Sequence, residues 1–434
     1  MLSRFFRVPA AALVAVVSTI LLVSTTSQQW TAPISASLAG SGTSGQGSSA
    51  STAPQPGLEL GSAGTKGGAS FEFLDPTSAS ANPTPILLYA QDWNGFPAKR
   101  SMAAWEQAAV THQVLVGTQG PVYGKMIAQL HAWNPKLKVL VYDLGPYTIK
   151  GTSDYNTLLA QHPSYFAHDK NGHLITVKAA SGTAAFPKNT LMDQGNAGWQ
   201  QFQAQRILKN IQAWGFDGAY VDSMGPGVFS GTTTGVPVDP RTGKAYTDAS
   251  WMQAGAAAMN AVKAAIGKSK YLMATGLVNG SEYTSFTHYL ADSNVDGMQT
   301  DSWLRVANAP LNNWPSANSL AADLAMVQSL NAMGKGFFGW TKVWINASSA
   351  QQAAWNTYAL AAYLLVDNGV SDYYLFNSPS NSDRTTIFFP NEREALGAAT
   401  GAYTVSGGVY HRSFQYGSVT LNTNGQSASI NLVP

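Results

Sequence analysis

Cysteine is absent from this 434-residue chain, and its absence removes several kinds of chemistry at once. Disulfide bonds, zinc fingers and thiol nucleophiles are excluded, and so is the lipid-modified cysteine of a lipoprotein. Charged residues are also scarce, at 11% against roughly 25% in an average soluble protein. Polar surface must therefore come from Asn, Gln, Ser and Thr, a composition that is common in secreted proteins.

The few charges form no basic patch. The formal net charge is +2 and no cluster of Lys or Arg occurs, which argues against a nucleic-acid partner. The seven His residues show no pairing at metal-ligand spacing near the expected strand ends, and we expect no metal and no cofactor. No Gly-x-Ser-x-Gly nucleophile elbow occurs. Hydrophobic residues at 45% supply a core large enough for one large domain or two ordinary ones.

The first 85 residues are predicted to contain an export signal followed by a linker. Arg4 and Arg7 precede an apolar run over residues 10–23, which is typical of an export signal within residues 1–34. Small residues at 36–39 offer a cleavage site beyond that run, and an uncleaved membrane anchor is the alternative. Residues 35–85 are a linker rich in Gly, Ser, Thr and Pro. We expect a secreted protein, or one tethered to the outer face of the cytoplasmic membrane.

From residue 86 onward, short apolar runs alternate with helix-length amphipathic stretches. Eight such units predict an α/β fold, a (β/α)8 TIM barrel over residues 86–399. An open doubly wound sheet is the alternative, but no Gly-rich phosphate turn follows the first run. The expected strands are 86–92, 113–116, 139–143, 218–222, 271–275, 297–301, 336–340 and 373–376.

Two further segments depart from this alternation. Residues 148–196, after the third expected strand, form the longest irregular stretch and are expected to lie over the barrel mouth. After Thr400 the pattern becomes all-β, which predicts a small C-terminal β-domain over 400–434. Asn424-Gly425 predicts a type I′ turn between its last two strands.

A six-residue pattern, Asp-Gly-x-x-x-Asp, closes the fourth and the sixth expected strands. It runs from Asp217 to Asp222 and again from Asp296 to Asp301. Each copy leaves one carboxylate where a parallel strand ends, and residues two apart share a face. Two carboxylates aimed into one mouth are what hydrolysis of a glycosidic bond requires. The alternative is a pair of acidic turn residues that cap the helices that follow.

Strands four and six are two apart, so their Cα atoms should lie roughly 9 to 10 Å from each other. That spacing is compatible with both retaining and inverting geometry. Glu occurs only six times in the chain, and Glu282, after the fifth strand, is the one Glu placed to compete with Asp301 as the acid.

Active residues of such barrels sit at the carboxyl ends of the strands. Polar side chains there are expected to bind sugar hydroxyls, and aromatic ones to stack on sugar rings. The expected hydroxyl-binding residues are Asp92, Asp143 and Asn279, the expected stacking residues are Trp93, Tyr142, Trp303 and Trp340, and Lys342 completes the substrate-binding set.

Several segments resemble the hypothetical glycosyl hydrolase families, with the endo-α-1,4-polygalactosaminidases as distant relatives. Residues 214–222 resemble their Gly-Phe-Asp-Gly strand that ends in Asp, and residues 165–172 resemble an aromatic and Asp-x-x-Gly loop. Residues 191–196, 278–282 and 412–419 are similar to further segments in the same order. The resemblance implies a barrel glycosidase with Asp222 as nucleophile or base. Relatives often carry Glu where this chain has Asp301, so the acid is either Asp301 or Glu282.

The sequence thus predicts an exported glycoside hydrolase that acts on a polysaccharide or oligosaccharide. Asp222 is the expected nucleophile or base, and Asp301 is preferred to Glu282 as the acid. We expect a monomer whose partner is the carbohydrate itself. The rival interpretation is a non-catalytic carbohydrate-binding barrel at the cell surface. Sugar identity, linkage and endo or exo action stay open at this point.

Overall fold

The computed structural model describes residues 86–92, 99–117, 120–178, 188–226, 233–377 and 389–433. The predicted export signal, the linker and Trp93 lie outside these ranges. Within them, no helix combines the length and the apolar character needed to cross a membrane.

Eight parallel strands form a closed barrel. Neighbours follow one another in chain order, and a parallel bridge between Leu88 and Tyr374 joins the first strand to the last. The amide of Tyr374 donates to the carbonyl of Leu87 at 2.9 Å. The predicted barrel is confirmed, and each predicted run overlaps one strand. The strands are β1 (Tyr89–Asp92), β2 (Val114–Gly117), β3 (Lys138–Asp143), β6 (Gly218–Val221), β9 (Tyr271–Leu277), β10 (Gly297–Thr300), β11 (Gly336–Lys342) and β12 (Tyr373–Asn377).

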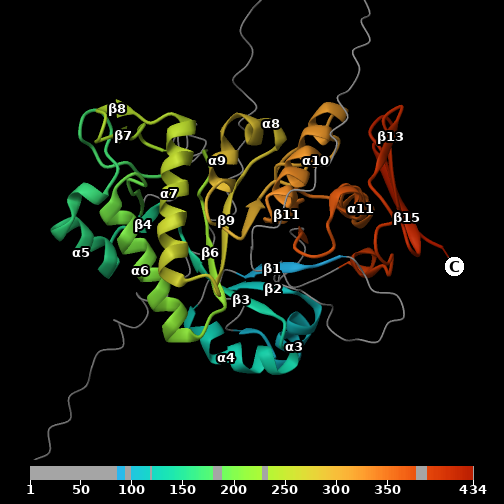
Figure 1. Ribbon diagram of the computed structural model, residues 1–434, viewed down its shortest axis with the longest axis horizontal. Coiled ribbons are helices and arrows are strands. Elements are labelled where there is room, and N and C mark those ends of the chain that lie inside the picture. The colour runs from blue at the N-terminus through green and yellow to red at the C-terminus, as the bar shows by residue number, and fades with distance from the viewer. Residues whose placement is uncertain are drawn as a thin grey trace, which may run out of the picture.

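Helices surround the strands (Figure 1). The long ones are α3 (Met102–Thr111), α4 (Gly120–Trp133), α6 (Ala197–Trp214), α7 (Asp248–Ile266), α10 (Ala317–Ala332) and α11 (Ser349–Val366). Most begin at a side-chain cap: Asn196, for example, accepts the amides of Gly198 and Trp199 at the start of α6. The same helix ends at Gly215, whose φ of 78° favours glycine. After β9 the chain takes three short pieces instead: α8 (Gly280–Glu282), the π-helical η4 (Tyr283–Thr287) and α9 (His288–Ala291).

Close packing inside the barrel explains the glycine of each Asp-Gly-x-x-x-Asp pattern. A Cβ at Gly218 would overlap the backbone of Tyr271, and a Cβ at Gly297 would meet the Tyr271 hydroxyl and the Phe338 ring. Both glycines therefore make room for Tyr271, whose ring helps to fill the barrel interior.

The first Asp of each pattern belongs to a contact that recurs around the barrel. The residue just before the second, fourth, sixth and eighth strands accepts a backbone N–H from the preceding strand. The donor and acceptor residues are Leu88 and Gln113 at 2.7 Å, Val139 and Asp217 at 2.8 Å, Leu272 and Asp296 at 2.7 Å, and Phe337 and Asp372 at 3.0 Å. These contacts fix the register of neighbouring strands at their amino-terminal ends.

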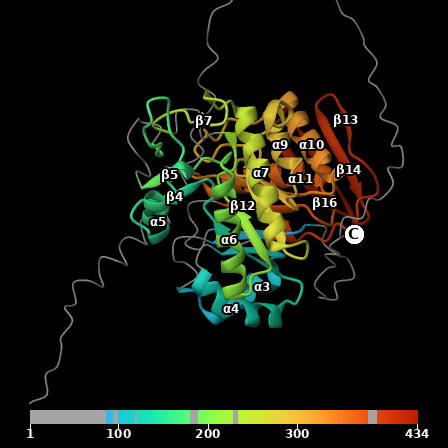
Figure 2. The same cartoon turned by 60° about the vertical axis from the view of Figure 1, so that its left-hand side comes forward.

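The segment after β3 is more regular than predicted. It contains β4 (Tyr147–Ile149), α5 (Ser153–Gln161), the 3-10 turn η2 (Pro163–Tyr165) and β5 (Asn189–Leu191), and β4 pairs antiparallel with β5. The prediction of an irregular stretch is wrong in this respect, because Thr152 caps α5 through the amide of Tyr155. A second hairpin follows β6, made of β7 (Val238–Asp239) and β8 (Lys244–Ala245). Figure 2 shows β4, β5 and α5 on the side of the barrel away from the C-terminal sheet.

An antiparallel sheet closes the chain, as predicted. Its strands are β13 (Thr404–Ser406), β14 (Val409–Phe414), β15 (Gly417–Asn422) and β16 (Ser427–Leu432). It packs on α11, and Arg412 donates to the carbonyls of Leu364 at 2.8 Å and Asp367 at 2.9 Å. The predicted type I′ turn is wrong. Residue Gln426 has a φ of 50°, whereas neither Asn424 nor Gly425 is among the positive-φ residues of the described chain.

Candidate active site at the carboxyl ends of the strands

Asp222 and Asp301 lie at the same end of the barrel. Asp222 directly follows β6 and Asp301 directly follows β10, with β9 between the two strands. Asp222 is 7% exposed. Burial raises the pKa of Asp222 to about 6, and the negative charge of Asp301 acts in the same direction. Burial and the charge of Asp301 therefore both favour the protonated form of Asp222.

Three donors hold the carboxylate of Asp222. The Tyr142 hydroxyl donates to Oδ2 at 2.7 Å, the amide of Ser223 donates to Oδ1 at 2.7 Å, and the Thr275 hydroxyl donates to Oδ1 at 3.3 Å. Ser223 has a φ of 61°, a conformation that is unfavourable for a residue other than glycine. Opposite it, a Cβ at Gly145 would overlap the Asp222 carbonyl. The local backbone is thus shaped to present this one side chain.

Asp301 contacts a buried lysine and a buried amide. The Nζ of Lys342 lies 3.1 Å from Oδ2 of Asp301, and the side-chain amide of Gln299 donates to Oδ1. The same Gln299 amide also donates to Oε1 of Gln91 at 3.3 Å, which links β10 to β1 across the barrel. The side chain of Asp301 is 20% exposed and that of Lys342 is fully buried. Asp301 is therefore the more accessible of the two acids.

Trp344 is the aromatic residue at this rim that sequence reasoning missed. It is partly exposed, its indole N–H donates to Asn377 Oδ1, and Lys342 Nζ lies 4.9 Å from its ring centroid. The signal was present: residues 340, 342 and 344 alternate on one face, so β11 continues its inward pattern past its last paired residue. Asn377 was missed for the same reason, because β12 extends one residue past the predicted end of its strand. Gln91, Thr275 and Gln299 lie within predicted strands but were not assigned to the site.

The two other predicted tryptophans are buried. Trp340 is 0% exposed and packs inside the barrel. Trp303 is 1% exposed, and its indole N–H donates to the carbonyl of Ala359 on α11 at 3.1 Å. Neither ring is open to a sugar in this structure, because both tryptophans are packed in the core.

Asp92 and Asp143 serve the scaffold rather than the mouth. Arg100 makes two hydrogen bonds of 2.8 Å to Asp92, which also accepts the Tyr123 hydroxyl. Arg206 of α6 binds both oxygens of Asp143, at 2.9 and 2.7 Å. Both carboxylates are turned outward to the helices, because inward-facing residues alternate with outward-facing ones along each strand.

Asn279 and Glu282 also occupy a structural corner. Asn279 caps α8 by accepting the amide of Glu282 at 3.0 Å, and Asp323 of α10 accepts the amide of Gly280 at 2.7 Å. Burial raises the pKa of Glu282, and the charge that adds to this effect comes from Asp248 at the start of α7. The structure thus places Glu282 beside Asp248, whereas Tyr142 and Lys342 are the predicted residues that it brings to Asp222 and Asp301.

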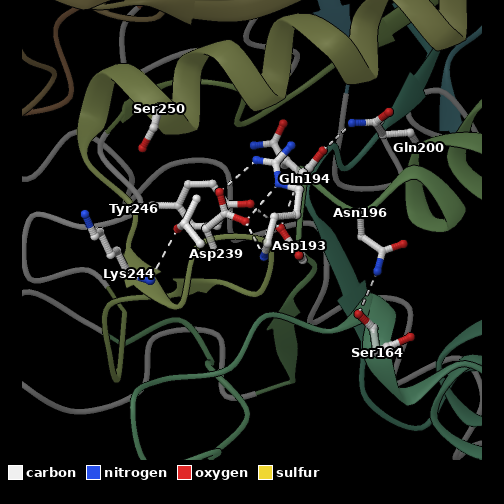
Figure 3. A network of polar contacts seen from close by, with 12 residues as sticks. Ser164, Asp193, Gln194, Asn196, Gln200, Asp239, Lys244, Tyr246 and Ser250 are labelled. Carbon is white, nitrogen blue, oxygen red and sulfur yellow. Dashed lines mark hydrogen bonds and ion pairs between the residues drawn. The ribbon is translucent and has the colours of Figure 1, made fainter.

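The loop over residues 191–196 is held by a polar network of its own (Figure 3). Asp193 accepts the hydroxyl of Tyr246 at 2.7 Å, and the side chain of Asn196 donates to the carbonyl of Ser164 at 2.9 Å. Gln200 donates to the carbonyl of Gln194 at 2.7 Å. This motif therefore anchors the segment after β3 to α6. Across the described ranges, no cluster of three or more His, Asp or Glu residues is arranged to hold a metal ion.

A (β/α)8 barrel with paired carboxylates at the carboxyl ends of its strands is characteristic of the glycoside hydrolase class. The chain belongs to hypothetical glycosyl hydrolase family 15, whose sequence model matches residues 131–418, more than half of its length. The match includes both Asp222 and Asp301. No curated protein matches the chain.

Solved structures show a weaker likeness. A cycloisomaltooligosaccharide glucanotransferase from Paenibacillus sp. is 15% identical with a TM-score of 0.39, covering 61% of this chain and 39% of that one. The cycloalternan-degrading enzyme from Trueperella pyogenes is 11% identical with a TM-score of 0.43, covering 68% and 44%. A GH31 family sulfoquinovosidase from E. rectale is 14% identical with a TM-score of 0.44, covering 68% and 43%. This chain thus spans less than half the length of these proteins.

Proposed function

We propose that this protein hydrolyses the O-glycosidic bonds of a polysaccharide or oligosaccharide, with Asp222 and Asp301 as the catalytic pair. One observation carries the proposal: two carboxyl groups end β6 and β10, and their charges act on each other in a site where the pKa of Asp222 is about 6. A carboxyl group whose pKa is raised toward neutral pH, with a second carboxyl group nearby, suits acid and base or nucleophile chemistry at a glycosidic bond.

Asp222 is the nucleophile or base in this proposal. The donors Tyr142, Ser223 and Thr275 favour its ionised form and fix its oxygens in place. A fixed carboxylate suits attack on a sugar carbon or activation of a water, since small errors in position are costly there.

Asp301 is the acid. Its side chain is the more exposed of the two, so a leaving oxygen can reach it for proton transfer. Tyr142 contacts Asp222, and Trp344 lies beside Lys342, which contacts Asp301; both aromatic residues are partly buried, and we assign Trp344 to stacking on a sugar ring. Export of the enzyme is part of the proposal and is supported by the signal-like residues 1–34.

The test is a panel of polysaccharides and oligosaccharides incubated with the wild type, with Asp222→Asn and with Asp301→Asn. New reducing ends that appear with the wild type and vanish with both variants support the proposal. Binding of a glycan without cleavage by any of the three proteins would identify a carbohydrate-binding barrel instead. Asp217→Asn, which changes the other Asp of the same pattern, is the matched control and should cleave like the wild type.

A further inference from the structure

Lys342 is a buried cation beside Asp301 and two indole rings. Its side chain is 0% exposed, and Nζ lies 3.1 Å from Oδ2 of Asp301. The same atom lies 3.7 Å from the ring centroid of Trp340 and 4.9 Å from that of Trp344. These surroundings support a role that acts through Asp301, rather than the substrate binding that its place after the seventh strand suggested.

The charges of the site can be counted from its members. Asp222 and Asp301 carry two negative charges when both are ionised, and Lys342 is a cation on which both of them act. A nearby carboxylate disfavours the ionised form of a carboxyl group, whereas a nearby cation favours it. Without Lys342, the charge of Asp301 would act on Asp222 uncompensated, and less of the Asp222 carboxylate would be left to act as nucleophile or base.

We propose that Lys342 is a positioning residue that holds Asp301 at the mouth of the barrel and, through its charge, favours the ionised form of Asp222. This proposal deepens the proposed function and rests on the same pair of carboxyl groups. Lys342 need not touch the substrate, because it acts through Asp301, with which it is in contact, and through its charge on Asp222.

The other groups that face this site do not disturb the count. The titratable ones are phenols on four strands, Tyr89 of β1, Tyr142 of β3, Tyr147 of β4 and Tyr220 of β6. Burial and the charges of Asp222 or Asp301 raise the pKa of each of them well above its usual value, so they stay neutral at any working pH. Gln91 of β1, Gln299 of β10 and Asn377 of β12 carry no charge. Lys342 and the two acids therefore supply the charge in this part of the barrel.

Burial of Lys342 favours its neutral form, whereas Asp301 and Asp222 favour its charged form. Its cation in turn stabilises the ionised form of Asp222. Removal of the cation must therefore raise the pKa of Asp222. The sign follows directly: the pH below which Asp222 is protonated, and thus inactive as nucleophile or base, moves upward.

The experiment compares the wild type with Lys342→Met, which keeps the apolar stem, and with Lys342→Arg, which keeps the charge. Two readouts are used: the pH dependence of kcat/KM on a cleaved glycan, and the pH titration of the Asp222 side-chain carbon by NMR. We expect Lys342→Met to move both acid-side midpoints upward by about one pH unit or more, and Lys342→Arg to restore them toward the wild type. Lys335→Met is the matched control, because Lys335 is a partly buried lysine that donates to the carbonyls of Ser293 and Val295 and lies away from Asp222 and Asp301 in the barrel, before β11.

Unchanged midpoints with a raised KM in Lys342→Met would overturn the proposal and make Lys342 a substrate ligand. Unchanged midpoints with a lower melting temperature alone would make it a structural residue. If Lys342→Met does not fold, the Asp222 titration in Lys342→Arg and Asp301→Asn decides instead: Asp301→Asn should lower the midpoint and Lys342→Arg should keep it. The NMR titration needs no turnover, so it tests this proposal even if no glycan is cleaved and the proposed function fails.

Discussion

Asp217 and Asp222 stand at opposite ends of β6 and have different partners. Asp217 accepts the amide of Val139 at 2.8 Å and the ring of His131 lies 2.9 Å from the same oxygen, at the amino-terminal end. Asp222 lies at the carboxyl end, in contact with Tyr142. One six-residue pattern thus joins a residue that sets strand register to a residue of the candidate active site.

The first prediction separates these two roles. Asp222→Asn should lower turnover by several orders of magnitude, because base or nucleophile chemistry is lost. Asp217→Ala should keep the activity of the folded enzyme but lower the free energy of unfolding by about 1 to 3 kcal/mol, because the buried amide of Val139 loses its acceptor. Denaturant titration and initial rates measure the two effects. A large loss of turnover in folded Asp217→Ala would contradict the division.

Asp222→Asn should not destabilise the fold at pH 7. The pKa of Asp222 in the folded protein, about 6, lies above the ordinary value of an aspartate. The folded state therefore binds more protons than the unfolded state between those values, so ionisation of Asp222 costs stability as the pH rises through about 6. Asparagine removes that cost. A melting temperature well below that of the wild type at pH 7 would show that the carboxylate stabilises the fold instead.

The barrel could be predicted because its strands are short, apolar and separated by helix-length segments. The pair of acids could be found because both stand where a strand pattern stops. The roles of Asp92, Asp143 and Trp303 could not be read in the same way. Whether a residue at a strand end faces inward or outward changes when the register shifts by one residue. Arg100 and Arg206 bind the two acids from other segments of the chain, so these contacts could not be predicted from the strand pattern.

Trp344 is the opposite case, an inward-facing residue that was not predicted. Its position lies beyond the predicted end of the seventh strand, but alternation from residue 340 carries it to the inner face. The corner around Glu282 required tertiary information as well, because Asp248 and Asp323 come from helices that are separated from it in the chain.

The second prediction identifies the acid. Asp301→Asn should lower turnover on a natural glycan by about 10² to 10⁴, but should largely spare an aryl glycoside whose leaving group needs no proton. Glu282→Gln should leave both rates close to those of the wild type, because the charge that acts on Glu282 comes from Asp248. Parallel kinetics on the two substrates measure this. The reverse pattern, in which Glu282→Gln loses only the natural substrate, would make Glu282 the acid.

The third prediction concerns Tyr142. Its hydroxyl donates to Asp222 at 2.7 Å and favours the ionised carboxylate. Tyr142→Phe should therefore raise the pKa of Asp222 above about 6 and move the acid limb of kcat/KM to higher pH. At pH 6 the variant should lose about tenfold or more in rate, and part of that loss should be recovered at pH 8. A uniform loss at every pH would instead mean that Tyr142 acts on the substrate and not on the charge of Asp222.

The last prediction tests the sugar platform. Trp344 is partly exposed at the rim, whereas Trp303 is buried against α11. Trp344→Ala should raise KM up to about tenfold, since an aromatic contact with a ring contributes about 0.5 to 1.5 kcal/mol. Trp303→Phe, the matched control, should lower the melting temperature because the indole N–H bond to Ala359 is lost, and should leave KM unchanged. Calorimetric titration of a short oligosaccharide into the inactive Asp222→Asn background isolates binding from chemistry. If Trp344→Ala binds the oligosaccharide as tightly as its parent while Trp303→Phe does not, the platform lies at Trp303, in the turn after β10, and the assignment of Trp344 to stacking is wrong.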